Sequence, residues 1–267
     1  MGRGVSRHGR ARRRVVIPPS RLRTAGRWLL DLAFPRECAG CSTPLVPAEP
    51  DEFCAGCLAT LPWMRPPVCV VCGEAFLVPS EADAERFEAR TCVRCRDHRP
   101  AFAMARAAFA YEGPIRHAIH AVKFRGRRAA GAALGRLLVD GLARTGELPG
   151  DADVIVPVPL HPSRLHERGY NQAALVAAAL ASALGRPMEQ DLLRRERATP
   201  PQVGLDRALR VENLKSAFGV PDPARVEGRV VLVVDDVLTT GATASACAVA
   251  LRRGGAPKVL VAAVARG

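Results

Sequence analysis

Four Cys-x-x-Cys pairs constrain the folding of this chain more than any other feature of its sequence. They hold eight of the nine cysteines: Cys38/Cys41, Cys54/Cys57, Cys69/Cys72 and Cys92/Cys95. A two-residue gap lets one tight turn direct two thiolates at the same ion, and two such turns complete a tetrahedral zinc site. We therefore predict one or two structural Zn²⁺ ions, each held by four cysteines. With every ligand a cysteine, no coordination position is left open for catalysis.

The spacing leaves open whether the pairs act sequentially or interleave. In sequential quartets 12 residues would separate the second and third cysteines of the first quartet and 19 those of the second, which suits zinc ribbons. A disulfide framework is an alternative that a cytoplasmic setting disfavours. Redox-active pairs are another, although these usually occur singly. Cys247 stands apart in an alanine-rich helical pattern, and we interpret it as a small core residue.

From residue 102 onward, apolar runs alternate with amphipathic stretches, which indicates successive strands and helices. Val230–Val234 is a β-branched and leucine run, typical of a strand buried on both faces of a parallel sheet. The strand, helix, strand order favours a right-handed crossover and an α/β fold with an open, mainly parallel sheet flanked by helices. The other expected elements are a strand within 153–159, a helix over 171–184 ended by Gly185, a helix over 242–253 and a strand over 258–264.

These patterns divide the chain into a basic extension (residues 1–28), a small cysteine-rich zinc-ribbon module (29–100) and an α/β domain (101–267). The net charge is +13, and residues 1–27 hold nine arginines and no acid. Such a segment suits contact with nucleic acid or an anionic membrane surface, or is a dispensable extension. No apolar run is long enough to span a bilayer, so we expect a cytoplasmic protein.

Two adjacent acids, Asp235 and Asp236, follow the expected strand 230–234. Ligands of open α/β sheets bind at the carboxyl ends of strands, where one acidic residue often holds ribose hydroxyls. The segment Thr239, Thr240, Gly241, Ala242 and Thr243 then places hydroxyls and N–H groups at a helix amino end, which favours a phosphate. A ribose 5-phosphate fits both halves. The alternative is that the acids cap the helix and the threonines form a turn.

A second anion site is indicated by residues 157–168, interpreted as a loop that carries Arg164, Arg168, His161 and His166. Arginines on such a loop can clamp a pyrophosphate. The alternative is a solvated basic loop. Lys123 and Arg125 either join the same site or are exposed helix charges.

At these residues the chain resembles the type I phosphoribosyltransferases, whose signature matches residues 231–243. More narrowly, residues 29–267 resemble the ComF family. The residues that carry this resemblance are the cysteine module, Lys123-Phe124, the Arg-Gly-Tyr-Asn-Gln string at 168–172, and Arg210, Asn213 and Ala217-Phe218.

The resemblance implies a phosphoribosyltransferase-like sheet in residues 101–267 and a ligand, phosphoribosyl pyrophosphate, bound with Mg²⁺. Asp235 and Asp236 would hold the ribose hydroxyls, and residues 239–243 the 5-phosphate. The loop that begins at Val158 and Pro159 would hold the pyrophosphate, with Arg164 or Arg168 closing over it and Lys123 nearby.

Two functions therefore remain open. The chain is a phosphoribosyltransferase that acts on an unknown acceptor, in association with DNA uptake and processing. Alternatively, it is a non-catalytic protein that reuses the fold to bind single-stranded DNA or DNA-uptake proteins.

Overall fold

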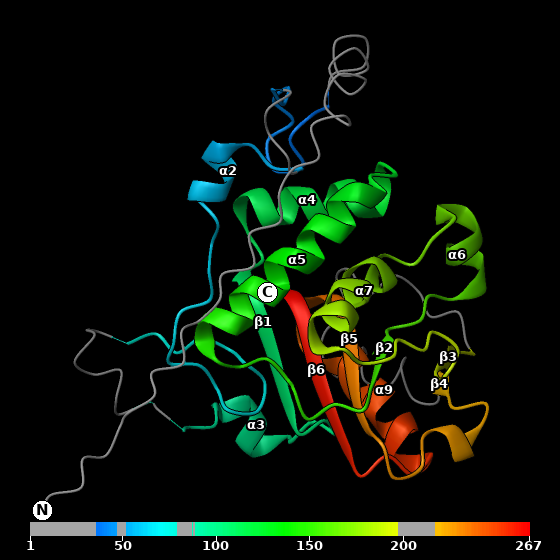
Figure 1. Ribbon diagram of the computed structural model, residues 1–267. Helices are drawn as coiled ribbons and strands as arrows, with labels where there is room; N and C mark the ends of the chain where they lie inside the picture. Colours follow the sequence, from blue (N-terminus) through cyan, green and yellow to red (C-terminus); the bar gives the residue numbers. More distant parts are fainter. Residues whose placement is uncertain (1–35, 47–51, 79–86, 88, 197–216) are drawn as a thin grey trace, which may run out of the picture.

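A four-stranded parallel sheet forms the centre of the molecule (Figure 1), which is described by a computed structural model for residues 36–46, 52–78, 87, 89–196 and 217–267. The strand order is β1-β6-β5-β2. Their bounds are β1 Met104–Ala110, β6 Lys258–Arg266, β5 Val230–Leu238 and β2 Val154–Pro157. All three pairings are parallel, so the predicted open α/β sheet is confirmed.

Helices cover both faces of the sheet (Figure 1). One face packs against α4 (Gly113–Phe124), α5 (Arg128–Thr145) and α7 (Gln172–Leu184). The other packs against α9 (Ala242–Arg253). The central strands β5 and β6 are buried on both sides over most of their length, which explains why Val230–Val234 and Val259–Ala265 are continuous apolar runs rather than alternating ones.

The chain has few aromatic side chains, and small residues line the contacts between its helices. The helical layer is therefore compact. Helices α5 and α7 approach so closely at Gly135 that a β-carbon there would lie 2.9 Å from the Val176 carbonyl oxygen. Helix α7 begins where expected, since the Asn171 side chain accepts a hydrogen bond from the Ala173 N–H at 3.0 Å. It ends at Gly185, whose φ of 62° is left-handed.

Three expectations about local structure were wrong. Strand β5 does not stop at Val234 but continues to Leu238, because its pairing with β6 extends to Leu238 opposite Arg266. The segment expected to be a loop contains helix α6 (Pro162–Arg168), which begins with proline and ends at left-handed Gly169. Strand β6 also runs two residues past the expected end at Val264.

The remaining described elements are short. They are α2 (Ala55–Ala59), α3 (Val93–Asp97), the antiparallel pair β3 (Arg194–Arg195) and β4 (Phe218–Gly219), and a 3₁₀ turn at Pro223–Arg225. The basic extension (residues 1–28), Arg210 and Asn213 lie outside the described residues. In the part of the chain that is described, no helix has the length and apolar character needed to cross a membrane.

The cysteine-rich segments cover the outer edge of the sheet at β1. The Ala105 N–H donates to the Val71 carbonyl at 2.7 Å, and the Met64 N–H donates to the Ala108 carbonyl at 2.8 Å. The Trp63 ring lies 4.5 Å from that of Phe109 between centroids. An edge strand exposes unpaired backbone groups, so this cover satisfies them and prevents pairing with another chain.

Candidate active site and zinc centres

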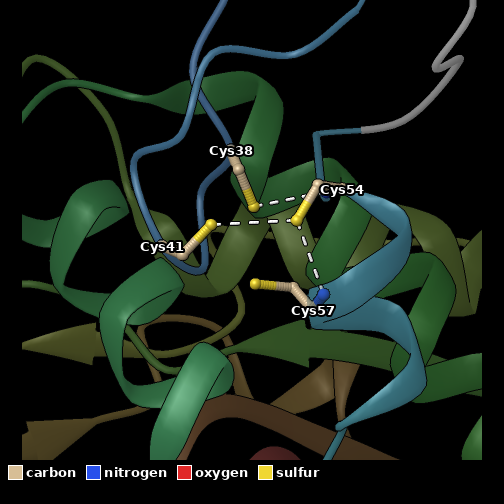
Figure 2. Close-up of side chains that lie close together, drawn as sticks. All are labelled: Cys38, Cys41, Cys54 and Cys57. Carbon is tan, nitrogen blue, oxygen red and sulfur yellow. Dashed lines mark hydrogen bonds between the residues drawn. The ribbon is translucent and has the colours of Figure 1, made fainter.

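The first zinc centre is a cluster of Cys38, Cys41, Cys54 and Cys57, whose sulfur atoms converge (Figure 2). Sγ of Cys41 lies 3.7 Å from Sγ of Cys54. Zn–S bonds of about 2.3 Å in a tetrahedron put sulfurs roughly 3.8 Å apart, so the cluster fits Zn²⁺ and is too open for a disulfide. Backbone N–H groups support it, since those of Gly40 and Cys54 each donate to Cys38 Sγ at 3.3 Å.

The second centre is formed by Cys69, Cys72, Cys92 and Cys95. Sγ of Cys72 lies 3.7 Å from Sγ of Cys92, and the Cys92 N–H donates to Cys69 Sγ at 3.3 Å. The quartets are therefore sequential, which the spacing alone left open. Cys247 is fully buried in the α9 core, as expected.

The two centres lie on opposite faces of the sheet. The first packs with α4, α5 and α7, whereas the second packs with α9 and Phe102. Gly73 shows how closely the second centre abuts the sheet, because its φ is 67° and a β-carbon there would lie 2.7 Å from the Ala105 carbonyl oxygen. The two ribbons thus clamp the β1 edge from both sides.

The two acids lie within the end of β5, and this corrects the expectation that they follow it side by side. Successive residues of a strand point to opposite faces. Asp236 points to the α4 face, where Lys123 Nζ lies 2.8 Å from its Oδ1. Asp235 shares the α9 face with Val231 and Val233, which pack in the α9 core. The Asp236 N–H also donates to Asp235 Oδ1 at 2.8 Å.

Asp236 is almost fully buried, with 8% of its side chain exposed. Its Oδ2 has no hydrogen-bond partner among the described residues. Burial alone would lower the pKa of Lys123, but the charge and hydrogen bond of Asp236, together with the charge of Asp235, outweigh that effect and raise the pKa. The pair is therefore an ion pair with one acceptor oxygen still unused, and a buried unused acceptor suits a ligand hydroxyl or a cation.

Asp235 is in a different electrostatic setting. Burial, together with the charge of Asp236, raises the pKa of its carboxyl to about 7. Arg195 approaches from β3, and burial beside Arg164 lowers the pKa of this guanidinium. The Asp235 carboxyl therefore changes its charge near neutral pH, which a group that binds a cation or moves a proton can use.

The predicted phosphate loop follows β5 directly. Gly241, with φ of 78°, is the N-cap of α9, and only glycine adopts this backbone conformation without strain. The Ala242 N–H donates to Thr240 Oγ1 at 3.3 Å, and the Ser245 N–H donates to the Gly241 carbonyl at 2.8 Å. Neither acid caps α9, so the alternative of acids as helix caps is not observed.

The arginines expected to close over a pyrophosphate lie on helix α6. Arg168 Nη1 donates to Gln172 Oε1 at 3.0 Å, and its guanidinium stacks 5.4 Å from the centroid of the Phe124 ring. The Val158 N–H donates to the Val234 carbonyl at 2.8 Å, and Pro159 has no N–H. Backbone donors for an anion are therefore absent at 158 and 159. Arg125 lies away from the acids, 3.5 Å from the Ser42 hydroxyl beside the first zinc centre.

Sequence reasoning missed three residues near the site. Tyr111 directly follows β1, and its hydroxyl lies 3.0 Å from Nε2 of His120. The same strand-end rule that located Asp235 would have found Tyr111. Arg266 and Arg195 carried no local signal, because only the packing of distant segments brings them to the loop.

Comparison with known proteins identifies the N-terminal module and several relatives of the chain. Residues 29–96 match the double zinc ribbon domain family. The chain is 37% identical over 204 residues to DNA utilization protein YhgH of Salmonella typhimurium, covering 73% of this chain and 88% of that protein. It is 31% identical over 218 residues to competence protein F of Haemophilus influenzae, covering 80% and 90%. Among solved structures, a glutamine phosphoribosylpyrophosphate amidotransferase from B. subtilis, solved with ADP and GMP, is 26% identical in sequence with a TM-score of 0.34. The match covers 51% of this chain and 26% of the amidotransferase chain.

Fold and site define the class of protein: an open parallel α/β domain with two acids and a glycine-capped helix at its carboxyl edge, joined to an N-terminal double zinc ribbon. The extent of the similarity to the Salmonella and Haemophilus proteins then identifies the family. This chain belongs to the ComF family of competence and DNA utilization proteins.

Proposed function

We propose that this chain binds phosphoribosyl pyrophosphate with Mg²⁺ at the carboxyl edge of its sheet and transfers the phosphoribosyl group to an acceptor nucleophile during the handling of DNA. The observation that supports this most is the order of groups along β5. Asp235 and Asp236 lie near the carboxyl end of the strand, which finishes at Leu238, and the Gly241-capped start of α9 follows after two further residues. One ribose 5-phosphate can engage both.

The residues have separate roles in this proposal. The hydroxyls and N–H groups of residues 239–243 lie at the amino end of the twelve-residue helix α9. They donate hydrogen bonds to the 5-phosphate. Asp236 Oδ2, which is buried and has no hydrogen-bond partner among the described residues, accepts a hydrogen bond from a ribose hydroxyl. Lys123 balances its charge until the ligand arrives. The carboxylates of Asp235 and Asp236 are also of the type that Mg²⁺ prefers, and Mg²⁺ supplies neutralisation of the departing pyrophosphate when it is bound.

The reaction would break the bond between the anomeric carbon and the pyrophosphate oxygen and form a bond from that carbon to the acceptor. Positive charge develops on the sugar, so the protein acts by positioning and by charge complementarity. Arg164 and Arg168, on α6, carry the positive charge that a leaving pyrophosphate needs. No covalent intermediate with the protein is required.

Calorimetric titration of phosphoribosyl pyrophosphate and Mg²⁺ into the zinc-loaded protein tests the proposal. We expect saturable binding that D236N abolishes. The matched control is D151N, since Asp151 is an exposed acid paired with Lys258 at the opposite end of the sheet. Absence of binding to folded wild type would refute the proposal. If the wild-type protein binds, release of pyrophosphate on addition of an acceptor would distinguish transfer of the phosphoribosyl group from binding alone.

A second candidate function, binding of single-stranded DNA without catalysis, is favoured by a groove between the first zinc centre and α4. Its volume is about 650 Å³, and among the described residues that line it none is acidic. The cationic and imidazole groups that line it are Arg116, His117, His120 and Arg125. Beside it, Phe124 is 68% exposed and lies 5.5 Å from the His120 ring between centroids. Basic groups interleaved with aromatic rings suit a phosphate backbone with stacked bases.

Positive potential in this groove also acts on His120, since burial and the charges of Arg116 and Lys123 lower its pKa. Fluorescence anisotropy with a labelled oligonucleotide tests this second function. Replacing Arg116 and Arg125 by glutamine should weaken binding and reduce its salt dependence by roughly two ionic contacts. Affinity equal to wild type would exclude the groove as the binding surface.

A further inference from the structure

Arg266, the last residue of β6, joins the second zinc centre to the loop that follows β5. One of its terminal nitrogens, Nη1, donates to the Leu238 carbonyl at 2.7 Å and also to the Thr239 carbonyl. The other, Nη2, lies 3.6 Å from Glu74 Oε2 and 3.9 Å from Cys72 Sγ. A single side chain therefore contacts both a zinc ligand and the start of the phosphate loop.

The charge of Arg266 must be balanced where it lies, because only 6% of its side chain is exposed. A buried guanidinium stays protonated and needs counter-charges within reach. Glu74 supplies one, although it is shared with Arg94. The second cysteine quartet supplies the other, since four thiolates around one Zn²⁺ carry a net charge of roughly −2. Zinc at this centre thus favours the observed position of the guanidinium.

The carbonyls held by Arg266 help to orient the N–H groups of the loop, and one of them, the Leu238 carbonyl, also accepts from the Gly267 N–H at 3.1 Å. The peptide unit is planar and trans, so a carbonyl and the N–H of the next residue point in opposite directions. Arg266 holds the carbonyls of Leu238 and Thr239 toward the ribbon. The N–H groups of Thr239 and Thr240 therefore point away from the Arg266 guanidinium.

We propose that Arg266 is a positioning residue that couples the second zinc centre to the phosphate loop, so that loss of zinc there disorders the loop and a phosphate bound to the loop retains zinc. The phosphate half of this statement rests on the function proposed above. Reciprocity follows from linkage, because each ligand must favour the state that the other favours.

Hydrogen exchange of the peptide that covers residues 238–243 tests the coupling without any ligand. We expect R266K, which keeps the charge but cannot hold two carbonyls in the same geometry, to exchange about tenfold faster there. The matched control is R106K. Arg106 is similarly buried and also contacts the second ribbon, at the carbonyls of Val70 (3.2 Å) and Cys69 (3.5 Å), but its other partners are Ala105 and Glu147, and none of these contacts is to the loop after β5. In R106K, hydrogen exchange of residues 238–243 should equal that of the wild type.

Two cysteine variants test the metal itself. We expect C92S, in the second centre, to accelerate exchange of the loop, whereas C41S, in the first, should leave it unchanged. Unchanged exchange in R266K, or equal acceleration in R106K, would overturn the proposal. If R266K does not retain both zinc ions, E74Q repeats the test without altering β6, and unchanged loop exchange in E74Q would be equally fatal. Failure of wild type to bind phosphoribosyl pyrophosphate would refute the proposed function but leave these exchange measurements decisive.

Discussion

Lys123 Nζ lies 2.8 Å from Oδ1 of Asp236, at the point where α4 passes the end of β5. The two residues are 113 positions apart (236 − 123) in the chain. The pair neutralises the most deeply buried acid of the site, yet leaves its Oδ2 unused. A ligand hydroxyl or cation can therefore enter without first breaking the ion pair.

Replacing Lys123 by methionine should destabilise the protein, because it leaves a buried carboxylate without its counter-charge. We expect a loss of about 2 kcal/mol at pH 7, below the usual range for a fully buried pair since 22% of the lysine side chain is exposed. Denaturant unfolding measures it. The double variant K123M/D236N should recover most of the loss; additive losses would show that the two groups do not interact.

Stability should fall as pH rises toward 7 because of Asp235. Its carboxyl has a pKa of about 7 in the folded protein, raised by burial and by Asp236, against about 3.9 in the unfolded chain. The folded state therefore holds a proton that the unfolded state releases, and this stabilising contribution is lost between about pH 4 and pH 7. The difference in unfolding free energy between wild type and D235N should change between about pH 4 and pH 7 and level off above pH 7, with D235N relatively more stable at the higher pH. A difference that does not vary with pH would contradict the raised pKa.

Binding of phosphoribosyl pyrophosphate with Mg²⁺ should show the opposite pH trend. A protonated Asp235 cannot bind a cation. As the pH increases toward 7, the binding affinity should therefore rise by up to about tenfold per pH unit, and above pH 7 it should level off. Calorimetry at pH 6, 7 and 8 measures this. D235N should bind weakly with no rise across that interval, and a wild-type affinity that is flat with pH would exclude Asp235 from the binding step.

Two zinc ions should be present per chain, one in each sequential quartet. Metal analysis of C92S should return one ion, whereas C247A should return two, because Cys247 is buried in the α9 core and belongs to neither cysteine quartet. Removing zinc with a chelator should unfold the ribbons, since metal binding supplies much of the folding free energy of such modules. One ion in wild type would contradict the two-centre arrangement.

Replacing Gly73 by alanine should loosen the second ribbon from the sheet. The new β-carbon would lie 2.7 Å from the Ala105 carbonyl oxygen at a φ of 67°. We expect a loss of about 3 kcal/mol in unfolding free energy and faster zinc release. Gly146 is the matched control, because its φ is 71° but nothing lies within 4 Å of the added carbon. G146A should cost only about 1 kcal/mol, and an equal loss in both variants would rule out the contact between ribbon and sheet.

Local patterns were sufficient for much of this protein. The four cysteine pairs indicated zinc, the apolar run before Asp235 indicated a buried parallel strand, and residues 242–253 matched α9 in full. These predictions succeed because metal chelation, strand burial and helix capping depend on residues close together in sequence. The strand itself ran four residues further than expected, since strand length is set by the neighbour with which it pairs, here β6.

The sequence by itself determined which chemistry the chain carries: thiolates in pairs, two acids, and a glycine-capped helix after a buried strand. Only the tertiary structure decided which groups meet. It grouped the cysteines sequentially, put the zinc centres on opposite faces of the sheet, turned Asp235 and Asp236 to opposite sides, and brought Lys123 and Arg266 to the end of β5. Charges that lie far apart in sequence become neighbours through packing of the sheet and helices, and no local pattern encodes that proximity.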